Sequence, residues 1–274
     1  MVGEMSSPWR ERAKRAVPAI VHIGRVGRLL RNQVRYPIAA TIIDLDRTVL
    51  AGPFAGMRYP GSGVNGYPEL LGTFEQCLTP AVEDIIRDPP PVVIVVGAAC
   101  GYYALGFART CPQTQVIAYE MDPTRVDVMR KYTRLNRLEG RIEARAMRCT
   151  AADLRRDLVA EPRSFIFMDV EGNEDNLLDP DAVPALRETE IIVELHDMFV
   201  PGVTARIRQR FALSHQQRIF EEQPPVRPPM PMAFDRFLRP HWQKMAWEER
   251  GARFQWLHLL PQSPAMAERG PATQ

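Results

Sequence analysis

The sequence predicts an α/β domain with an open, mostly parallel sheet that is covered by helices on both faces. From residue 91 onward, short apolar runs rich in β-branched residues alternate with amphipathic helical stretches. Such alternation is typical of parallel strands joined by right-handed helical crossovers. The first apolar run also ends in glycines that open a helix, which is where open α/β sheets place ligand sites.

Composition limits the classes of protein that fit. The chain has 274 residues, of which 45% are hydrophobic and 25% charged, so it can bury a sizeable core. A formal net charge of +2 gives no reason to expect nucleic-acid binding. No apolar run approaches the roughly 20 residues that cross a bilayer, and no signal peptide is recognisable, so we expect a cytoplasmic protein without a membrane span. The four cysteines lack metal-ligand spacing and are expected to be reduced.

The amino-terminal part, residues 1–66, is predicted to form a cap ahead of the main domain. Residues 8–35 have the pattern of a basic amphipathic helix interrupted near Pro18 and Gly24. A solvated accessory face, a lid over the site and a homodimer contact all fit this segment. Residues 41–57 predict a short hairpin, and a turn rich in glycine and proline follows it.

The main domain, residues 67–274, begins with helical spacing over residues 70–88, where Pro80 predicts a break or kink. Strands follow at VVIVVG, QVIAYE, RIEARAM, SFIFMDV and EIIVELHD, with helices at YYALGFART and PTRVDVMRKYTRLNRL between them. The tail predicts a helix at VTARIRQRFA and a strand near HQQRIF. A proline-rich insertion at 224–240, a helix near HWQKMAWEERG and a last strand, FQWLHLLP, complete it.

The strongest local signal is the run VVIVVGAACGYYALG, residues 92–106, in which a strand runs into a glycine turn. Gly97 and Gly101 would form this turn and let backbone N–H groups approach a ligand. A dinucleotide fingerprint would need glycine where Ala99 and Tyr102 stand, so binding of a pyrophosphate is disfavoured. Glu120 ends the next strand, nineteen positions after Gly101, where a carboxylate accepts hydrogen bonds from ribose hydroxyls. Together the turn and the acid favour a nucleoside site over a surface acid.

Two further strands end in groups that carry chemistry. MDVEG places Asp169 and Glu171 at a strand end, and strand alternation would send both side chains to one side unless Gly172 turns the chain first. Capping of the following helix is the alternative for these acids. VELHD adds Glu194, His196 and Asp197 one strand later. His196 is the preferred general base because an ordinary imidazole is largely neutral near pH 7, although a structural role is an alternative. His215 is a weaker candidate.

In this order, the blocks LGTFE, VGAACGYYALG, YEMDP, MDVEG and VELHD resemble the FkbM family of class I methyltransferases, and the likeness covers about half of the chain, mainly residues 92–215. The resemblance implies a Rossmann-like fold with S-adenosylmethionine as cofactor. It places the methionine portion of the cofactor at Gly97, Ala99 and Gly101, and the transferred methyl beside Asp169. It places the ribose at Glu120, the adenosine beside Met121 and Asp122, and the adenine ring near Asp153.

Two positions depart from the family pattern. The class often has an acid where this chain has Val95 and a glycine where it has Ala99, so the amino group of the cofactor is expected to be held elsewhere, for which we name Glu75. The resemblance thus predicts methyl transfer to an oxygen of a small molecule or sugar-containing metabolite.

Three alternatives stay open. In the leading interpretation no metal takes part; in a variant, Asp169, Glu194 and either His196 or Asp197 hold Mg²⁺ or a similar hard cation. A regulatory subunit that binds S-adenosylmethionine without turnover is the second alternative. An NAD-dependent oxidoreductase is the third, and Ala99 and Tyr102 disfavour it.

Overall fold

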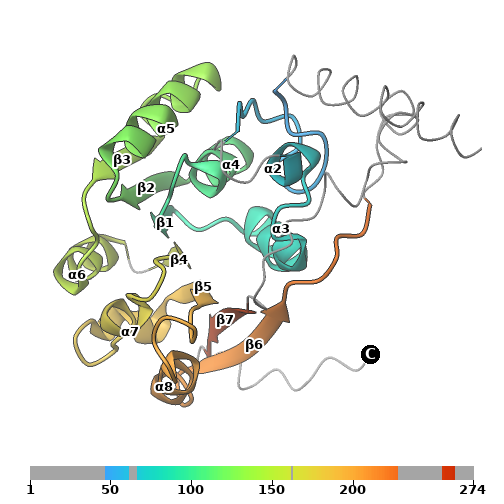
Figure 1. Cartoon of the computed structure of the whole chain (residues 1–274). Helices are drawn as coiled ribbons and strands as arrows, with labels where there is room; N and C mark the ends of the chain where they lie inside the picture. The colour runs from blue at the N-terminus through green and yellow to red at the C-terminus, as the bar shows by residue number, and fades with distance from the viewer. Residues whose placement is uncertain (1–46, 62–66, 162, 228–254, 263–274) are drawn as a thin grey trace, which may run out of the picture. The chain divides into compact units, whose positions relative to one another are not determined.

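Among the described residues, seven strands form one sheet in the order β3-β2-β1-β4-β5-β7-β6 (Figure 1). The first five strands along the chain are parallel, and β7 lies antiparallel between β5 and β6. The predicted mostly parallel, Rossmann-like sheet is thereby confirmed. The strands are β1 (Val92–Val96), β2 (Gln115–Glu120), β3 (Ile142–Ala146), β4 (Ser164–Met168), β5 (Glu190–Leu195), β6 (His215–Glu221) and β7 (Gln255–Pro261).

Helices cover both faces of the sheet, as the alternating pattern predicts (Figure 1). The elements α3, α4 and α5 lie on one face, and α6, α7 and α8 lie on the other. The helices are α2 (Tyr67–Leu71), α3 (Thr79–Arg87), α4 (Tyr102–Thr110), α5 (Pro123–Leu135), α6 (Ala151–Ala160), α7 (Glu174–Leu177) and α8 (Val203–Arg210), with 3-10 turns η1 (Gln76–Leu78) and η2 (Pro184–Glu188).

The computed structural model describes residues 47–61, 67–161, 163–227 and 255–262, all within one compact unit. The predicted basic helix at 8–35, the helix near 241–251, most of the proline-rich insertion and the domain boundary at residue 66 lie outside these ranges. In the described part of the chain, no helix combines the length and apolar character that a membrane span needs. Each of the four cysteines is a free thiol, as expected.

The buried strands contribute alternate residues to two separate cores. In β1, Val93 and Val95 face the core beneath α3, α4 and α5, whereas Ile94 and Val96 face the core beneath α6, α7 and α8. All four are at most 2% exposed. A strand buried on both faces needs an unbroken apolar run, and this requirement explains the sequence VVIVV. The two cores hold the carboxyl ends of the strands in fixed positions.

The predicted helix over 70–88 is interrupted. α2 ends at Leu71, and the chain resumes helical structure only at η1, after Glu75 with a left-handed φ of 48°. A Cβ on Gly72 would lie 1.9 Å from the carbonyl oxygen of Ala51, so another segment crosses the chain closely at this point. Pro80 lies in the first turn of α3, where the missing N–H costs no helical hydrogen bond.

Residues 47–61 form a loop closed by one antiparallel bridge, Thr48 to Arg58. The hairpin predicted at 41–57 lies partly outside the described residues, which begin at residue 47. The loop's side chains Phe54 and Tyr59 are buried in the core on the α4 face. The ring of Phe54 rests on Gly106 of α4, where a Cβ would lie 2.6 Å from ring carbons. The loop therefore packs directly onto the helix that follows the glycine turn.

Candidate functional site

Two adjoining pockets open at the carboxyl ends of β1, β2, β4 and β5. β1 is flanked by β2 on one side and β4 on the other, so the strand order reverses there, and such switch points hold the ligands of open α/β sheets. The pocket beside β2, about 510 Å³, is called the β2 pocket, and the pocket beside β5, about 350 Å³, the β5 pocket. Both are lined by Gly97, Ala99, Arg125, Asp169 and Glu171.

Glu120 is the best-positioned acid of the β2 pocket. The residue is 6% exposed, and its two carboxylate oxygens accept hydrogen bonds from the backbone N–H groups of Ala99 (2.9 Å) and Asp122 (2.8 Å). Each oxygen keeps a lone pair for a further donor. The structure thus links the glycine turn to the end of β2 through the carboxylate that the sequence singles out.

The turn after β1 has a left-handed backbone at Gly97 (φ 80°), Ala99 (φ 47°) and Gly101 (φ 92°). A Cβ on Gly97 would lie 1.6 Å from the carbonyl oxygen of Asp169, so glycine lets the ends of β1 and β4 meet. A Cβ on Gly101 would lie 2.6 Å from Cγ of Met129 in α5. Gly101 is therefore needed for packing against α5, and its expected place beside a ligand stays a prediction.

Three other predicted residues of the cofactor site lie near the β2 pocket. Met121 lines the pocket and is 62% exposed. Asp122 lines it too, while its side chain caps α5 by accepting from the N–H of Thr124. Asp153 is not among the described residues that line this pocket, and its carboxylate forms the capping box of α6 and an ion pair with Arg156. Met147, Arg148 and Cys149 line the pocket in its place.

Glu75, which the sequence analysis names as the holder of the amino group, lines the β5 pocket. It is 4% exposed and accepts a 2.6 Å hydrogen bond from the hydroxyl of Tyr103. Burial and the nearby Glu75 raise the pKa of Tyr103 well above its ordinary value, so the phenol stays a donor. Among the described residues that line this pocket are five acids: Glu69, Glu75, Asp169, Glu171 and Glu194.

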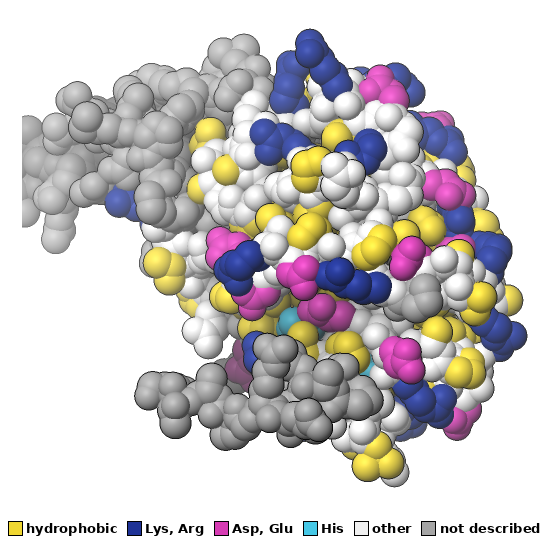
Figure 2. Space-filling view, turned by 180° about the vertical axis from the view of Figure 1, so that it is seen from behind, with side chains coloured by type: hydrophobic (Ala, Val, Ile, Leu, Met, Phe, Trp, Pro, Cys, Tyr) yellow, Lys and Arg dark blue, Asp and Glu magenta, His cyan; other side chains and the backbone are white. Residues whose placement is uncertain are grey.

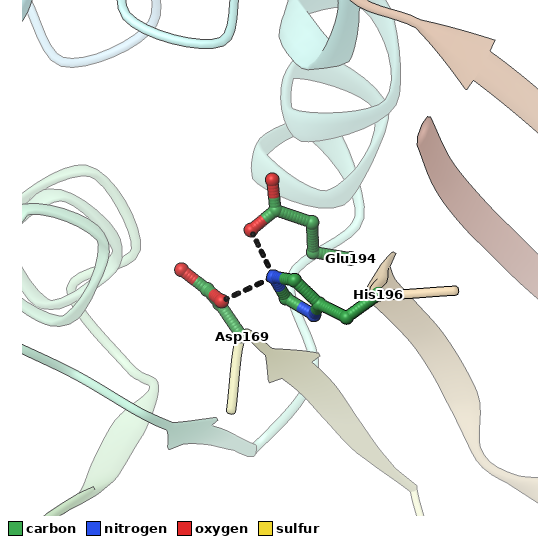
Figure 3. Close-up of side chains that lie close together, drawn as sticks. All are labelled: Asp169, Glu194 and His196. Atoms are coloured by element: carbon green, nitrogen blue, oxygen red, sulfur yellow. Dashed lines mark ion pairs between the residues drawn. The ribbon is translucent and has the colours of Figure 1, made fainter. Parts of the chain in front are cut away.

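Asp169, Glu194 and His196 meet at the ends of β4 and β5, where their side chains point toward one another (Figure 3). Nε2 of His196 lies 3.4 Å from Oε2 of Glu194 and 3.7 Å from Oδ1 of Asp169. Nδ1 of the same ring lies 2.5 Å from Oε1 of Glu174, at the start of α7. Figure 2 shows acidic side chains gathered around a recess in which a histidine ring is visible.

This environment changes the charge of His196. Burial alone would lower its pKa, but hydrogen bonds with Glu174 and Glu194 and the charge of Asp169 outweigh burial and raise the pKa to about 10. In the metal-free chain this raised pKa favours a protonated ring near pH 7, and a protonated ring cannot accept a proton from an acceptor. Burial and the carboxylate of Glu194 raise the pKa of Asp169 well above its ordinary value.

The remaining candidates have different surroundings. β4 ends at Met168, and Glu171 follows with a left-handed φ of 47°, so strand alternation does not relate it to Asp169. Glu171 is exposed and lines both pockets. The residue at the N-cap of α7 is Asn173, so the capping role considered for Glu171 is absent there.

Neither Asp197 nor His215 is among the described residues that line the two pockets. The carboxylate of Asp197 accepts from the N–H of Gly202 (2.9 Å) and from the hydroxyl of Thr204, at the start of α8. The ring of His215 lies 2.9 Å from the carbonyl oxygen of Thr189, next to the amino end of β5. His215 is thus at the opposite edge of the sheet from the pockets.

Sequence reasoning did not find Glu174. It is fully buried, and it fixes the imidazole of His196 from the far side. The acid follows β4 by a short loop in a run of several polar residues, NEDN, in which no spacing marks one side chain as special. Only the packing of α7 against the sheet distinguishes it.

No protein-family model matches the sequence, and no curated protein matches it. Among solved structures, the chain is similar to the O-methyltransferase from Bacillus cereus in complex with SAH, at 14% identity over 66% of this chain and 78% of that one, with a TM-score of 0.44. It is also similar to the O-methyltransferase TomG from Streptomyces achromogenes, in complex with SAM, at 11% identity over 65% and 76%, with a TM-score of 0.43. Likenesses of this size are too small to support an inference.

Proposed function

We propose that this chain is an S-adenosylmethionine-dependent methyltransferase that methylates an oxygen of a small molecule. The observation that carries the proposal is the buried carboxylate of Glu120, which two backbone N–H groups hold at the end of β2. It faces a pocket that continues, past Gly97 and Ala99, into a second pocket lined by acids. The ordered sequence blocks support the FkbM family within this class.

The charges of the two pockets suit the cofactor. S-adenosylmethionine carries two positive groups, the sulfonium and the amino group, at the end of the molecule opposite its adenine. With the ribose on Glu120 and the adenine beside Met121, these groups lie toward the β5 pocket. Asp169 and Glu75 line that pocket, and a bound positive group favours the ionised form of their carboxyl groups. Attraction between opposite charges is strong in a partly buried site, so this orientation is favoured over its reverse.

The transfer itself needs an in-line acceptor oxygen more than it needs an elaborate catalyst. The bond from sulfur to the methyl carbon breaks while the bond from that carbon to the acceptor oxygen forms, and the cofactor leaves as neutral-sulfur S-adenosylhomocysteine. The hydroxyl proton passes to a carboxylate. We assign this role to Glu171, which is exposed and can release the proton to water. His196, being protonated, serves as a hydrogen-bond donor that fixes Glu194 and Asp169 instead of acting as the base.

Calorimetry tests the proposal. The full chain titrated with S-adenosylmethionine is expected to bind one equivalent with a micromolar Kd, and NAD is expected to give no comparable heat because Ala99 and Tyr102 replace the glycines of the dinucleotide turn. Absence of binding by S-adenosylmethionine, or equal binding of NAD, contradicts the proposal. A metal-assisted form of the same reaction is favoured by one observation, the cluster of Asp169, Glu194 and His196.

A further inference from the structure

We infer that Asp169, Glu194 and His196 bind a divalent transition-metal cation in the β5 pocket, with Glu174 as the residue that positions the imidazole. One ligand atom of each of the three side chains lies within 4.8 Å of the others. They come from the ends of the neighbouring strands β4 and β5, which both cores hold in place (Figure 3). The inference concerns cation binding and holds whether or not the methyl donor is S-adenosylmethionine.

The distances match a shared ion. Ligand atoms about 2.1 Å from one cation, at octahedral or tetrahedral angles, lie about 3.0 to 3.5 Å from each other. Nε2 of His196 is 3.4 Å from Oε2 of Glu194 and 3.7 Å from Oδ1 of Asp169. The 3.4 Å contact is a long hydrogen bond in the metal-free chain, and both separations need little movement to surround an ion. The three side chains are therefore arranged for coordination before any cation arrives.

The orientation of the imidazole supports the same conclusion. A histidine that binds a metal through one ring nitrogen usually donates the other N–H to a carboxylate, which fixes the ring. Here Nδ1 faces Oε1 of Glu174 at 2.5 Å, leaving Nε2 directed at the two other acids. Glu174 is itself held, because its Oε1 accepts a 3.0 Å hydrogen bond from the N–H of Gly172.

Charge supplies an independent reason. Three carboxylates, from Asp169, Glu174 and Glu194, surround a single imidazole, and the last two are at most 2% exposed. Oδ1 of Asp169 is buried and has no hydrogen-bond partner in the described part of the chain. Buried carboxylates are costly unless they are paired or coordinate a metal. A divalent cation at Nε2 would displace the proton of His196, balance the carboxylates and satisfy this oxygen.

The donor set identifies the class of cation. Mg²⁺ and Ca²⁺ prefer oxygen ligands alone, whereas one imidazole with two carboxylates suits Mn²⁺, Zn²⁺ and related first-row ions. Mg²⁺, the cation named in the metal variant of the sequence interpretation, is therefore a poorer match, and Asp197 is not a ligand because its carboxylate is engaged at α8. Three protein ligands leave coordination positions open, as in catalytic metal sites. If the proposed function is correct, those positions face the acceptor oxygen.

Manganese binding followed by electron paramagnetic resonance tests the inference without any measurement of activity. Addition of the metal-free full chain to Mn²⁺ should remove the signal of the free aqueous ion, at one ion per chain, and Zn²⁺ should compete. Glu194→Gln removes a ligand and should weaken binding by more than about 100-fold. Glu174→Gln keeps all three ligands and should weaken binding by about 10- to 100-fold, the usual effect of losing the partner that orients a ligand.

Asp197→Asn is the matched control, since it removes the same charge one residue from His196 but outside the cluster. Its Mn²⁺ affinity should stay within about twofold of wild type, because coordination and not nearby charge determines binding. Thermal unfolding gives a second readout that also shows whether each variant folds: Mn²⁺ should raise the Tm of the wild type and of Asp197→Asn, and not that of Glu194→Gln.

Two results would overturn the inference: no loss of the free Mn²⁺ signal with the wild-type chain, or equal binding by wild type and Glu194→Gln. The outcome is distinguishable from failure of the proposed function. Binding of S-adenosylmethionine is measured separately on chelator-treated protein, so a chain that binds Mn²⁺ but not S-adenosylmethionine refutes only the function, and the reverse result refutes only the metal site.

Discussion

Replacing Glu120 with alanine removes the carboxylate that faces the β2 pocket and holds the N–H groups of Ala99 and Asp122. A hydrogen bond to a charged group contributes about 1.5 to 3 kcal/mol, so losing the ribose contact should weaken binding of S-adenosylmethionine by roughly 10- to 150-fold. The two backbone donors lie at the pocket surface, where water can replace the carboxylate, so the fold should survive. Calorimetry with the full chain measures the change directly.

Asp127→Ala is a suitable control because its side chain is 75% exposed on α5 and is absent from the described linings of both pockets. Its affinity for S-adenosylmethionine should equal that of the wild type. Glu120→Gln keeps one acceptor oxygen and loses the charge, and its affinity should lie between those of the wild type and Glu120→Ala. If Glu120→Ala binds as tightly as the control, the ribose assignment and the orientation of the cofactor are both refuted.

Three other substitutions follow from the structure. Asp169→Asn keeps the size of a side chain that lines both pockets and removes its negative charge, so calorimetry and a turnover assay should both show losses; unchanged affinity contradicts the proposed place of the sulfonium. Gly101→Val puts a branched side chain against Met129 at a left-handed φ, and urea unfolding should show that the free energy of unfolding falls by about 1 to 3 kcal/mol. A stability equal to that of the wild type contradicts the packing role of Gly101. Burial lowers the pKa of His215 below 6.5, so the unfolded chain binds the proton more readily, and the free energy of unfolding should fall as pH drops below about 6.5. His215→Gln should flatten this dependence on pH, and an unchanged dependence contradicts the assignment to His215.

The central fold was predictable because its strands are buried on both faces. An unbroken apolar run such as residues 92–96 has few alternatives to a parallel strand, and the glycines after it mark the turn. The break at Gly72 was not predictable, since it depends on the loop at residues 51–52, which crosses from elsewhere in the chain. Local periodicity contains no information about such a crossing.

The candidate site was predictable in position but not in charge. The strand ends locate Glu120, Asp169, Glu194 and His196, because parallel strands end at the same edge of a sheet. The protonation of His196 depends on Glu174, and that acid reaches the ring through the packing of α7. A side chain's pKa is set by neighbours in space, so the ordinary imidazole pKa assumed from the sequence does not apply to His196 in the metal-free chain.

Methyl transfer is tested most directly with S-adenosylmethionine that carries a labelled methyl group. The full chain is incubated with this donor and a native small-molecule extract, with and without added Mn²⁺, and mass spectrometry follows the label and S-adenosylhomocysteine. We expect a labelled small molecule and an equal amount of S-adenosylhomocysteine, both strongly reduced in Asp169→Asn. A wild-type chain that binds the donor tightly but forms no S-adenosylhomocysteine above the level of a protein-free control would contradict it and would favour a regulatory binding protein.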